Sequence, residues 1–258
     1  MDLADEQSEW GNLDEAISLY HRVLFFDSLI NYSYEACKNL ASCYILKKDF
    51  VKAREFSRIA GNLSPTDSMS NEMIFQVAYL HLLENDFNYA LIDLYGIRDL
   101  NSDYFRNKKN FYLGIAFFQQ TDYQKSYGYF AGCLDSTDSR SLKALKNVFD
   151  EVAHLEKRYQ PKTARILSII LPGAGQLYCG EYKAAINSFL LTAGLALLAV
   201  NTAINYTFVD AAVSVLPWFQ RYYQGGFENA GKATIIKKER KIKEQYQHVL
   251  SVIEQSKS

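Results

Sequence analysis

The chain has 258 residues, with 28 Lys and Arg against 29 Asp and Glu, so its formal net charge at pH 7 is −1. This balance argues against a duplex nucleic-acid partner, because proteins that bind duplexes present a dense cationic face to the phosphates. The length allows one helical array and a smaller second unit.

A motif recurs four times in the first half of the chain. Each copy has Asp or Asn before an aromatic residue or Leu, and a small residue follows four positions after the Asp or Asn. The small residues are Ala16, Ala53, Ala90 and Ser126, at intervals of 37, 37 and 36 residues. Self-similarity at such a period indicates a stacked array of helical hairpins. We expect the Asp or Asn to form a tight turn and to cap the second helix of each hairpin.

The second copy also contains the large-small pair Leu40-Ala41, and the fourth repeats this pair as Leu113-Gly114. Together these residues resemble the tetratricopeptide repeat over about residues 1–138. The resemblance implies a solenoid of hairpins whose first helices line a concave groove. In the first copy Leu3-Ala4 aligns with Leu40-Ala41, so the opening helix would begin before Met1. Either this helix is short or an N-terminal segment such as a signal peptide has been removed, and we favour removal.

The groove positions follow from counting along the first helix of each hairpin. Lysines beside aromatic residues favour an extended peptide, and an acidic end on that peptide would suit the lysines. The expected partner-binding residues are Lys38, Ser42, Phe75, Tyr79, Lys108, Phe111, Tyr112 and Ile115. They partly resemble the clamp with which some tetratricopeptide domains hold a carboxylate, although Ser42, Gln76 and Tyr112 replace its usual Asn and Arg. A solvated groove without a partner is the alternative.

Residues 139–160 carry apolar side chains on one helical stripe, which predicts a helix that caps the array. Beyond it, residues 161–231 form an expected membrane-embedded unit. No charged side chain occurs from Ala184 to Val209, a run of 26 residues. A bilayer core requires about 20 apolar residues in a helix, so this run is long enough to span.

The C-terminal part of the sequence predicts two further helical segments. Ala211–Phe219 is apolar but short and contains Pro217, so we expect the return arm of a helical hairpin. Residues 232–258 are expected to form a basic helical tail. Within the uncharged run, Ser188, Thr192 and Ala196 belong to a small-residue ridge of the kind that packed membrane helices prefer.

A glycine-rich turn precedes the uncharged run, with the sequence Leu171-Pro-Gly-Ala-Gly-Gln-Leu-Tyr-Cys-Gly180. It is similar to the Pro-Gly-x-Gly-Gln-x-Tyr-x-Gly turn that precedes paired hydrophobic helices in a group of bacterial tetratricopeptide proteins. The resemblance covers about residues 160–235 and implies membrane association without enzymatic activity. The residues of this membrane-turn motif are Pro172, Gly173, Gly175, Gln176, Tyr178 and Gly180. The motif lacks the Lys-Ser/Thr ending of a phosphate-binding loop.

Residues of the types that carry out catalysis are scattered along the chain. No histidine lies near a nucleophile or a metal partner in the sequence, and no cysteine pair has the spacing of metal ligands. These residues are His21, His81, His154, His248, Cys37, Cys43, Cys133 and Cys179. We therefore expect no catalytic residue, no metal site, no cofactor and no small-molecule substrate.

The sequence thus predicts an all-α protein, in which a tetratricopeptide-like solenoid of helical hairpins is followed by a hydrophobic helical hairpin. We expect a membrane-tethered scaffold that binds a protein or extended peptide and contacts membrane lipid. The alternatives are a structural subunit assembled through its hydrophobic helices, and a soluble protein with Ala184–Val200 buried in its core. Basic residues on both sides of the hydrophobic unit favour cytoplasmic repeats. The incomplete first repeat and the resemblance favour the periplasmic side, which we predict.

Overall fold

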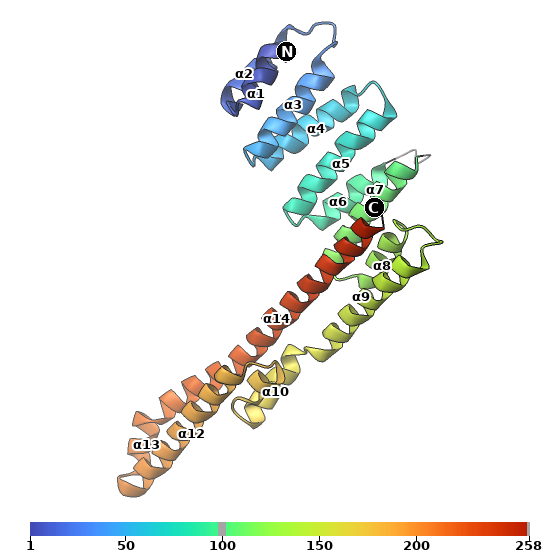
Figure 1. The fold of residues 1–258 in the computed structure, drawn as a ribbon. Coiled ribbons are helices and arrows are strands. Elements are labelled where there is room, and N and C mark those ends of the chain that lie inside the picture. Colours follow the sequence, from blue (N-terminus) through green and yellow to red (C-terminus); the bar gives the residue numbers. More distant parts are fainter. Residues whose placement is uncertain (98–101, 257–258) are drawn as a thin grey trace. The chain divides into compact units, whose positions relative to one another are not determined.

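A computed structural model of the protein describes residues 1–97 and 102–256 (Figure 1). The described residues form helices and connecting turns, without a strand among them, and the predicted all-α fold class is confirmed. They divide into two compact units, Met1–Ser139 and Arg140–Ser258. The last two residues of the predicted basic tail, 257–258, lie outside the described part.

The first unit is a succession of helical hairpins, and each helix packs on the next one along the chain. Figure 1 follows them from blue to green. The helices are α1 (Asp2–Glu9), α2 (Leu13–Phe26), α3 (Ser33–Leu46), α4 (Phe50–Leu63), α5 (Asp67–Leu83), α6 (Phe87–Gly96), α7 (Asp103–Gln119) and α8 (Tyr123–Ala131). The turns between α1 and α2, α3 and α4, α5 and α6, and α7 and α8 are those at which the sequence motif recurs.

The turns inside these four hairpins share one backbone geometry. The residue before each Asp or Asn has a positive φ, namely Gly11 at 81°, Lys48 at 60°, Asn85 at 61° and Thr121 at 63°. The amide of the following Asp or Asn then donates to a carbonyl five residues earlier, as Asp49 does to Tyr44 at 2.9 Å. This is the Schellman arrangement, which satisfies the free carbonyls at a helix end.

Side-chain capping is less uniform than the sequence motif predicts. Asp49 and Asp122 accept a hydrogen bond from the amides of Lys52 and Lys125 and so cap α4 and α8. The side chains of Asn12 and Asp86 form no such bond. The predicted cap is therefore present in the second and fourth hairpins, whereas the backbone turn is present in all four.

The small residues of the motif lie where the two helices of a hairpin meet. Ala16, Ala53, Ala90 and Ser126 are all fully buried. Ser126 occupies this position without leaving its hydroxyl unpaired, because Oγ donates to the carbonyl of Gly114 at 2.8 Å. A larger side chain at these positions would force the helices apart.

The second unit contains a long helix that the sequence did not predict as one piece. Its helices are α9 (Ser139–Arg158), α10 (Pro161–Ile170), α11 (Ala174–Tyr178), α12 (Tyr182–Asn205), α13 (Phe208–Ser214) and α14 (Leu216–Gln255). α14 has 40 residues and joins the predicted return arm to the predicted basic tail. Pro217 does not break it, because a proline in the first turn removes an amide that has no partner there. The predicted boundary at residue 231 consequently falls inside this helix.

The helix predicted to cap the array, α9, belongs to the second unit. Within that unit Glu156 of α9 accepts a hydrogen bond from Lys238 of α14, with Nζ 2.9 Å from the carboxylate. The apolar stripe of α9 is buried, with Leu145, Val152 and Leu155 at most 3% exposed.

Candidate functional site

Three of the predicted groove residues, Lys108, Phe75 and Tyr112, lie around Glu72 of α5. The ammonium group of Lys108 on α7 pairs with the Glu72 carboxylate and lies 4.9 Å from the centre of the Phe75 ring. The Tyr104 hydroxyl donates to Glu72 at 3.0 Å and accepts from Lys108 at 3.2 Å. Burial opposes the charge of Lys108, but the hydrogen bonds to Glu72 and Tyr104 outweigh it and raise its pKa. The charge of this lysine is therefore already matched within the protein.

Phe75, which was predicted to line the groove, is buried in the structure. Its side chain is 1% exposed and stacks on Phe105, with ring centres 6.2 Å apart. The Tyr112 ring is tilted against it, with ring centres 5.6 Å apart. The ring belongs to the core between α5 and α7, because its position on α5 faces the next hairpin. Tyr112 is itself half-buried, and burial raises the pKa of its hydroxyl.

The remaining predicted groove residues are spread over three helices. On α3, Lys38 pairs with Glu35 one turn earlier, and the Ser42 hydroxyl donates to the Lys38 carbonyl at 3.1 Å. Tyr79 on α5 is 43% exposed. Phe111 and Ile115 on α7 are half-buried.

Glu72 and Tyr104 complete this cluster, and neither was predicted from the sequence. Glu72 lies one helical turn before Gln76, and Tyr104 lies one helical turn before Lys108. The four-residue spacing was available in the sequence. The pairing between α5 and α7 was not, because Glu72 and Lys108 are 36 positions apart.

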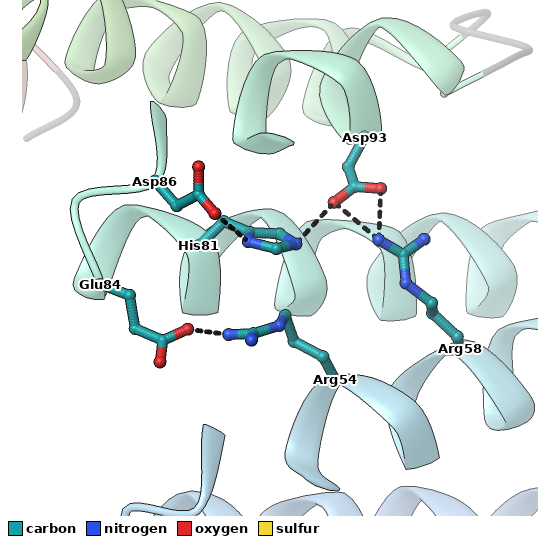
Figure 2. A network of polar contacts seen from close by, with 6 residues as sticks. All are labelled: Arg54, Arg58, His81, Glu84, Asp86 and Asp93. Carbon is teal, nitrogen blue, oxygen red and sulfur yellow. Dashed lines mark hydrogen bonds and ion pairs between the residues drawn. The ribbon is translucent and has the colours of Figure 1, made fainter. Parts of the chain in front are cut away.

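A second polar network joins α4, α5 and α6 (Figure 2). Nη2 of Arg58 lies 2.9 and 3.1 Å from the two carboxylate oxygens of Asp93. His81 lies between two carboxylates, with Nε2 3.5 Å from Asp93 and Nδ1 3.7 Å from Asp86. Burial, followed by the charge of Arg54, lowers the pKa of His81. Of these contacts, the pair between Arg58 and Asp93 connects the second hairpin to the third.

The membrane-turn motif folds around a short chain of hydrogen bonds. The amide of Gly175 donates to Ser168 Oγ at 2.9 Å, and that hydroxyl donates to Gln176 Oε1 at 3.1 Å. Nε2 of Gln176 then donates to the carbonyl of Gly226 at 2.8 Å. The motif glutamine thus connects α10 and α11 to the middle of α14, although 50 residues separate it from Gly226.

The tyrosine of the motif has a structural role that the sequence did not reveal. The Tyr178 hydroxyl accepts from the amide of Gln160 at 3.1 Å and donates to the carbonyl of Arg158. It holds the link between α9 and α10. Pro172 and Gly173 form the turn that ends α10, and Gly173 has a φ of 91°.

The motif ends in the same turn as the hairpins of the first unit. Gly180 has a φ of 79°, and the amide of Glu181 donates to the carbonyl of Gln176 at 2.8 Å. Ala185 follows four residues after Glu181 and is buried, as Ala53 is after Asp49. A Schellman turn followed by an acid, an aromatic residue and a buried alanine therefore occurs in both units.

α12 is long and apolar enough to cross a membrane, by length and composition, and it is the one such helix among residues 1–97 and 102–256. Its apolar side chains are largely exposed, with Leu190 at 62%, Leu197 at 72% and Ile204 at 75%. The small-residue ridge instead packs within the chain. Thr192 is 4% exposed, and a Cβ atom at Gly226 of α14 would come within 2.8 Å of Ser188 Oγ.

No protein-family model matches this chain, and no curated protein matches it either.

Proposed function

We propose that the protein is a membrane-anchored scaffold, in which the second unit inserts into a bilayer and the first binds a protein or extended peptide. The exposure of α12 carries this proposal. The 18-residue window of this helix has a mean hydropathy of 1.7, yet only 11% of the window is buried. A core helix of a soluble protein is covered by its neighbours, so this exposure supports a lipid environment over the soluble alternative.

The exposed apolar surface extends beyond α12, which supports an embedded hairpin rather than one isolated helix. Ile170 at the end of α10 is 76% exposed, Phe208 and Val213 of α13 are 79% and 73% exposed, and Trp218 at the start of α14 is 53% exposed. Monomeric soluble proteins rarely leave such large apolar patches in water. Trp218 also has the amphipathic ring that is enriched at membrane interfaces.

The proposed array is of the tetratricopeptide type. The support is the recurrence of one turn and one buried small residue in four successive hairpins, at the spacing of the sequence motif. The exposed rings of Tyr79 and Tyr104 are the surfaces that we assign to the partner. Because Glu72 already pairs with Lys108, the cluster offers aromatic and hydroxyl contacts to a peptide rather than a free cation for an acidic end.

The anchor is tested by adding charge to the exposed face of α12. The doubly substituted chain Leu190→Asp, Leu197→Asp is compared with Leu46→Asp, Val51→Asp, which adds the same charge at residues of the first unit that are 65% and 66% exposed. We expect the native chain and the first-unit variant to remain in membranes after a carbonate wash. The α12 variant should be released, because each buried charge costs about 3 kcal/mol in a bilayer. Release of the native chain would refute the anchor.

The partner surface is tested by cross-linking in membranes. Tyr79→Ala with Tyr104→Ala should remove a cross-linked partner, while Tyr32→Ala, which alters a 57% exposed ring before α3, should retain it. If the double variant still forms the cross-link, the partner binds at another surface of the protein. We place the first unit on the periplasmic side on the strength of the sequence resemblance, and protease added to intact spheroplasts should then cleave it.

A further inference from the structure

A cavity of about 610 Å³ lies within the second unit, between α11, the first turns of α12 and the middle of α14. Its charged lining residues are Glu181, Arg221, Lys237 and Arg240, so the wall carries a net charge of 3 − 1 = +2. The residues from α14 recur at helical spacing from Arg221 to Arg240, so that one face of this helix forms one side. The cavity is therefore a cationic recess in a unit with an extensive apolar surface.

The cations that line the cavity differ from their neighbours on the same helix. Lys238 pairs with Glu156, and Lys241 pairs with Glu244. Arg221, Lys237 and Arg240 form no ion pair with any described residue. Three cations that share one recess repel one another, so an anion in the cavity would be stabilised by charge-assisted contacts.

Uncharged donors also lie at this cavity. Ser188, one of the lining residues, has a buried Oγ with no hydrogen-bond partner in the described chain. The N-cap residue of α12, Glu181, makes no side-chain cap bond, so the first amides of this 24-residue helix receive nothing from their cap. A buried hydroxyl and free amides at a helix N-terminus both favour an anionic oxygen.

The cavity also has apolar lining residues. Leu191, Tyr222 and Ile236 line it, and Leu191 leads onto the exposed face of α12. The uncharged run of the sequence begins at Ala184, in the first turn of α12, and Ala184 lines the cavity together with Glu181. A molecule that matches both the cationic and the apolar lining has an anionic group attached to hydrocarbon.

We propose that this cavity binds the phosphate group of an anionic phospholipid. The proposal rests on the proposed insertion of α12, which places the cavity at the depth of the headgroups. Lys237, Arg240 and the first amides of α12 hold the phosphate, Ser188 Oγ donates to it or to the glycerol oxygens, and the acyl chains follow the apolar wall past Leu191. The proposal requires that the phosphate binds at this one site. A diffuse attraction between the basic tail and an anionic membrane surface would not satisfy it.

The test compares two variants of the full chain that lose the same charge from the same helix. In Lys237→Gln, Arg240→Gln the cavity loses two cations, and in Lys232→Gln, Lys243→Gln two exposed cations outside it are lost. Binding of fluorescent short-chain phosphatidylglycerol is measured in micelles of a neutral detergent, with phosphatidylcholine as the comparison lipid. We expect the cavity variant to bind phosphatidylglycerol at least tenfold more weakly and the control to stay within twofold of the native chain.

A third variant, with a milder substitution, distinguishes loss of lipid binding from loss of folding. Ser188→Ala keeps the helix and removes one donor, and it should weaken phosphatidylglycerol binding by two- to tenfold. Equal weakening in the two charge variants, or no preference of the native chain for phosphatidylglycerol over phosphatidylcholine, would overturn the proposal. Inorganic phosphate that displaces the lipid at micromolar concentration would identify a site for soluble phosphate and overturn the lipid assignment.

The binding measurement in micelles is independent of membrane insertion. If the native chain is released by the carbonate wash while the cavity still binds phosphatidylglycerol selectively, the anchor fails and the lipid site stands. If the chain resists the wash and the binding is unselective, the anchor stands and the lipid site fails.

Discussion

Nη2 of Arg58 on α4 lies 2.9 and 3.1 Å from the two carboxylate oxygens of Asp93 on α6. The Asp93 side chain is only 8% exposed, whereas that of Arg58 is 54% exposed. An exposed arginine thus supplies the charge that a buried carboxylate requires. The contact crosses from the second hairpin to the third, so it contributes to the stacking of the array (Figure 2).

Substitution of Arg58 by Met should destabilise the first unit by about 1–3 kcal/mol, because it leaves the buried Asp93 carboxylate without its cation. Urea unfolding of residues 1–139 measures the change. Arg106→Met is the matched control, since its partner Asp103 is 87% exposed and water replaces the contact. A loss of stability as large in the control as in Arg58→Met would show that burial of Asp93 is not the cause.

The stability of the first unit should fall as the pH falls through the ordinary range of histidine. Burial lowers the pKa of His81 below its usual value of 6.5 in the folded chain. Between the folded and the unfolded pKa the unfolded chain binds more protons, so acidification favours unfolding. Stability from this group is complete above about pH 6.5 and is lost as the pH drops toward the folded pKa.

The measurement for His81 is the urea midpoint between pH 7.5 and pH 5.5. His81→Phe retains an aromatic ring beside Tyr89, on which the imidazole stacks with centres 5.5 Å apart, and it should flatten this part of the profile. His154→Phe alters a side chain that is 59% exposed and should leave the slope as it is. An unchanged slope in His81→Phe would assign the pH dependence to other groups.

Two glycines of the fourth hairpin should respond oppositely to the same substitution. A Cβ atom at Gly114 would come within 2.8 Å of the Phe130 ring, which is fully buried, so Gly114→Ala should cost about 1–3 kcal/mol through overpacking. Nothing lies within 4 Å of a Cβ atom at Gly128 in α8. Gly128→Ala should stabilise by about 0.4–1 kcal/mol, because it restricts the unfolded chain. Thermal unfolding of the two variants checks both signs.

The membrane-turn motif should not tolerate a methyl group at Gly175. A Cβ atom there would overlap the carbonyl oxygen of Ala164 and lie close to Ser168 Oγ, so the hydrogen bonds that lead to Gln176 would be displaced. We expect Gly175→Ala to be cleaved faster by protease between α10 and α12 in detergent micelles. Gly194→Ala, at a position of α12 with open space around it, should be cleaved at the native rate.

The turns of the array show which features are local enough to be predicted. Asp49 and Phe50 in the turn and Ala53 four residues after Asp49 predicted a hairpin at the right place, because a helix end and a buried small residue depend on neighbours within one turn of chain. Lys48 and Thr121 adopt the left-handed conformation without being glycine, and the recurrence of Asp after them was the only local sign.

Contacts between residues that are far apart in the chain could not be predicted from the sequence. Phe75 and Tyr79 lie four positions apart on α5, yet the first is buried against Phe105 and the second is exposed. Periodicity gives the face of a helix but not which neighbour will cover it. For the same reason the sequence did not predict the contact of Glu72 with Lys108 or that of Gly226 with Gln176. The two residues of each pair lie on helices that meet only after folding.

The sequence by itself determined the all-α class, the repeating hairpins, the glycine turn and the position of the uncharged helix, because these depend on local backbone preference and on the spacing of apolar residues. The tertiary structure decided that Pro217 lies in the first turn of a 40-residue helix, that Lys108 is paired with Glu72, and that Arg221, Lys237 and Arg240 share a cavity. Charge pairing and cavities arise from the packing of helices against one another, and a linear sequence does not contain those distances.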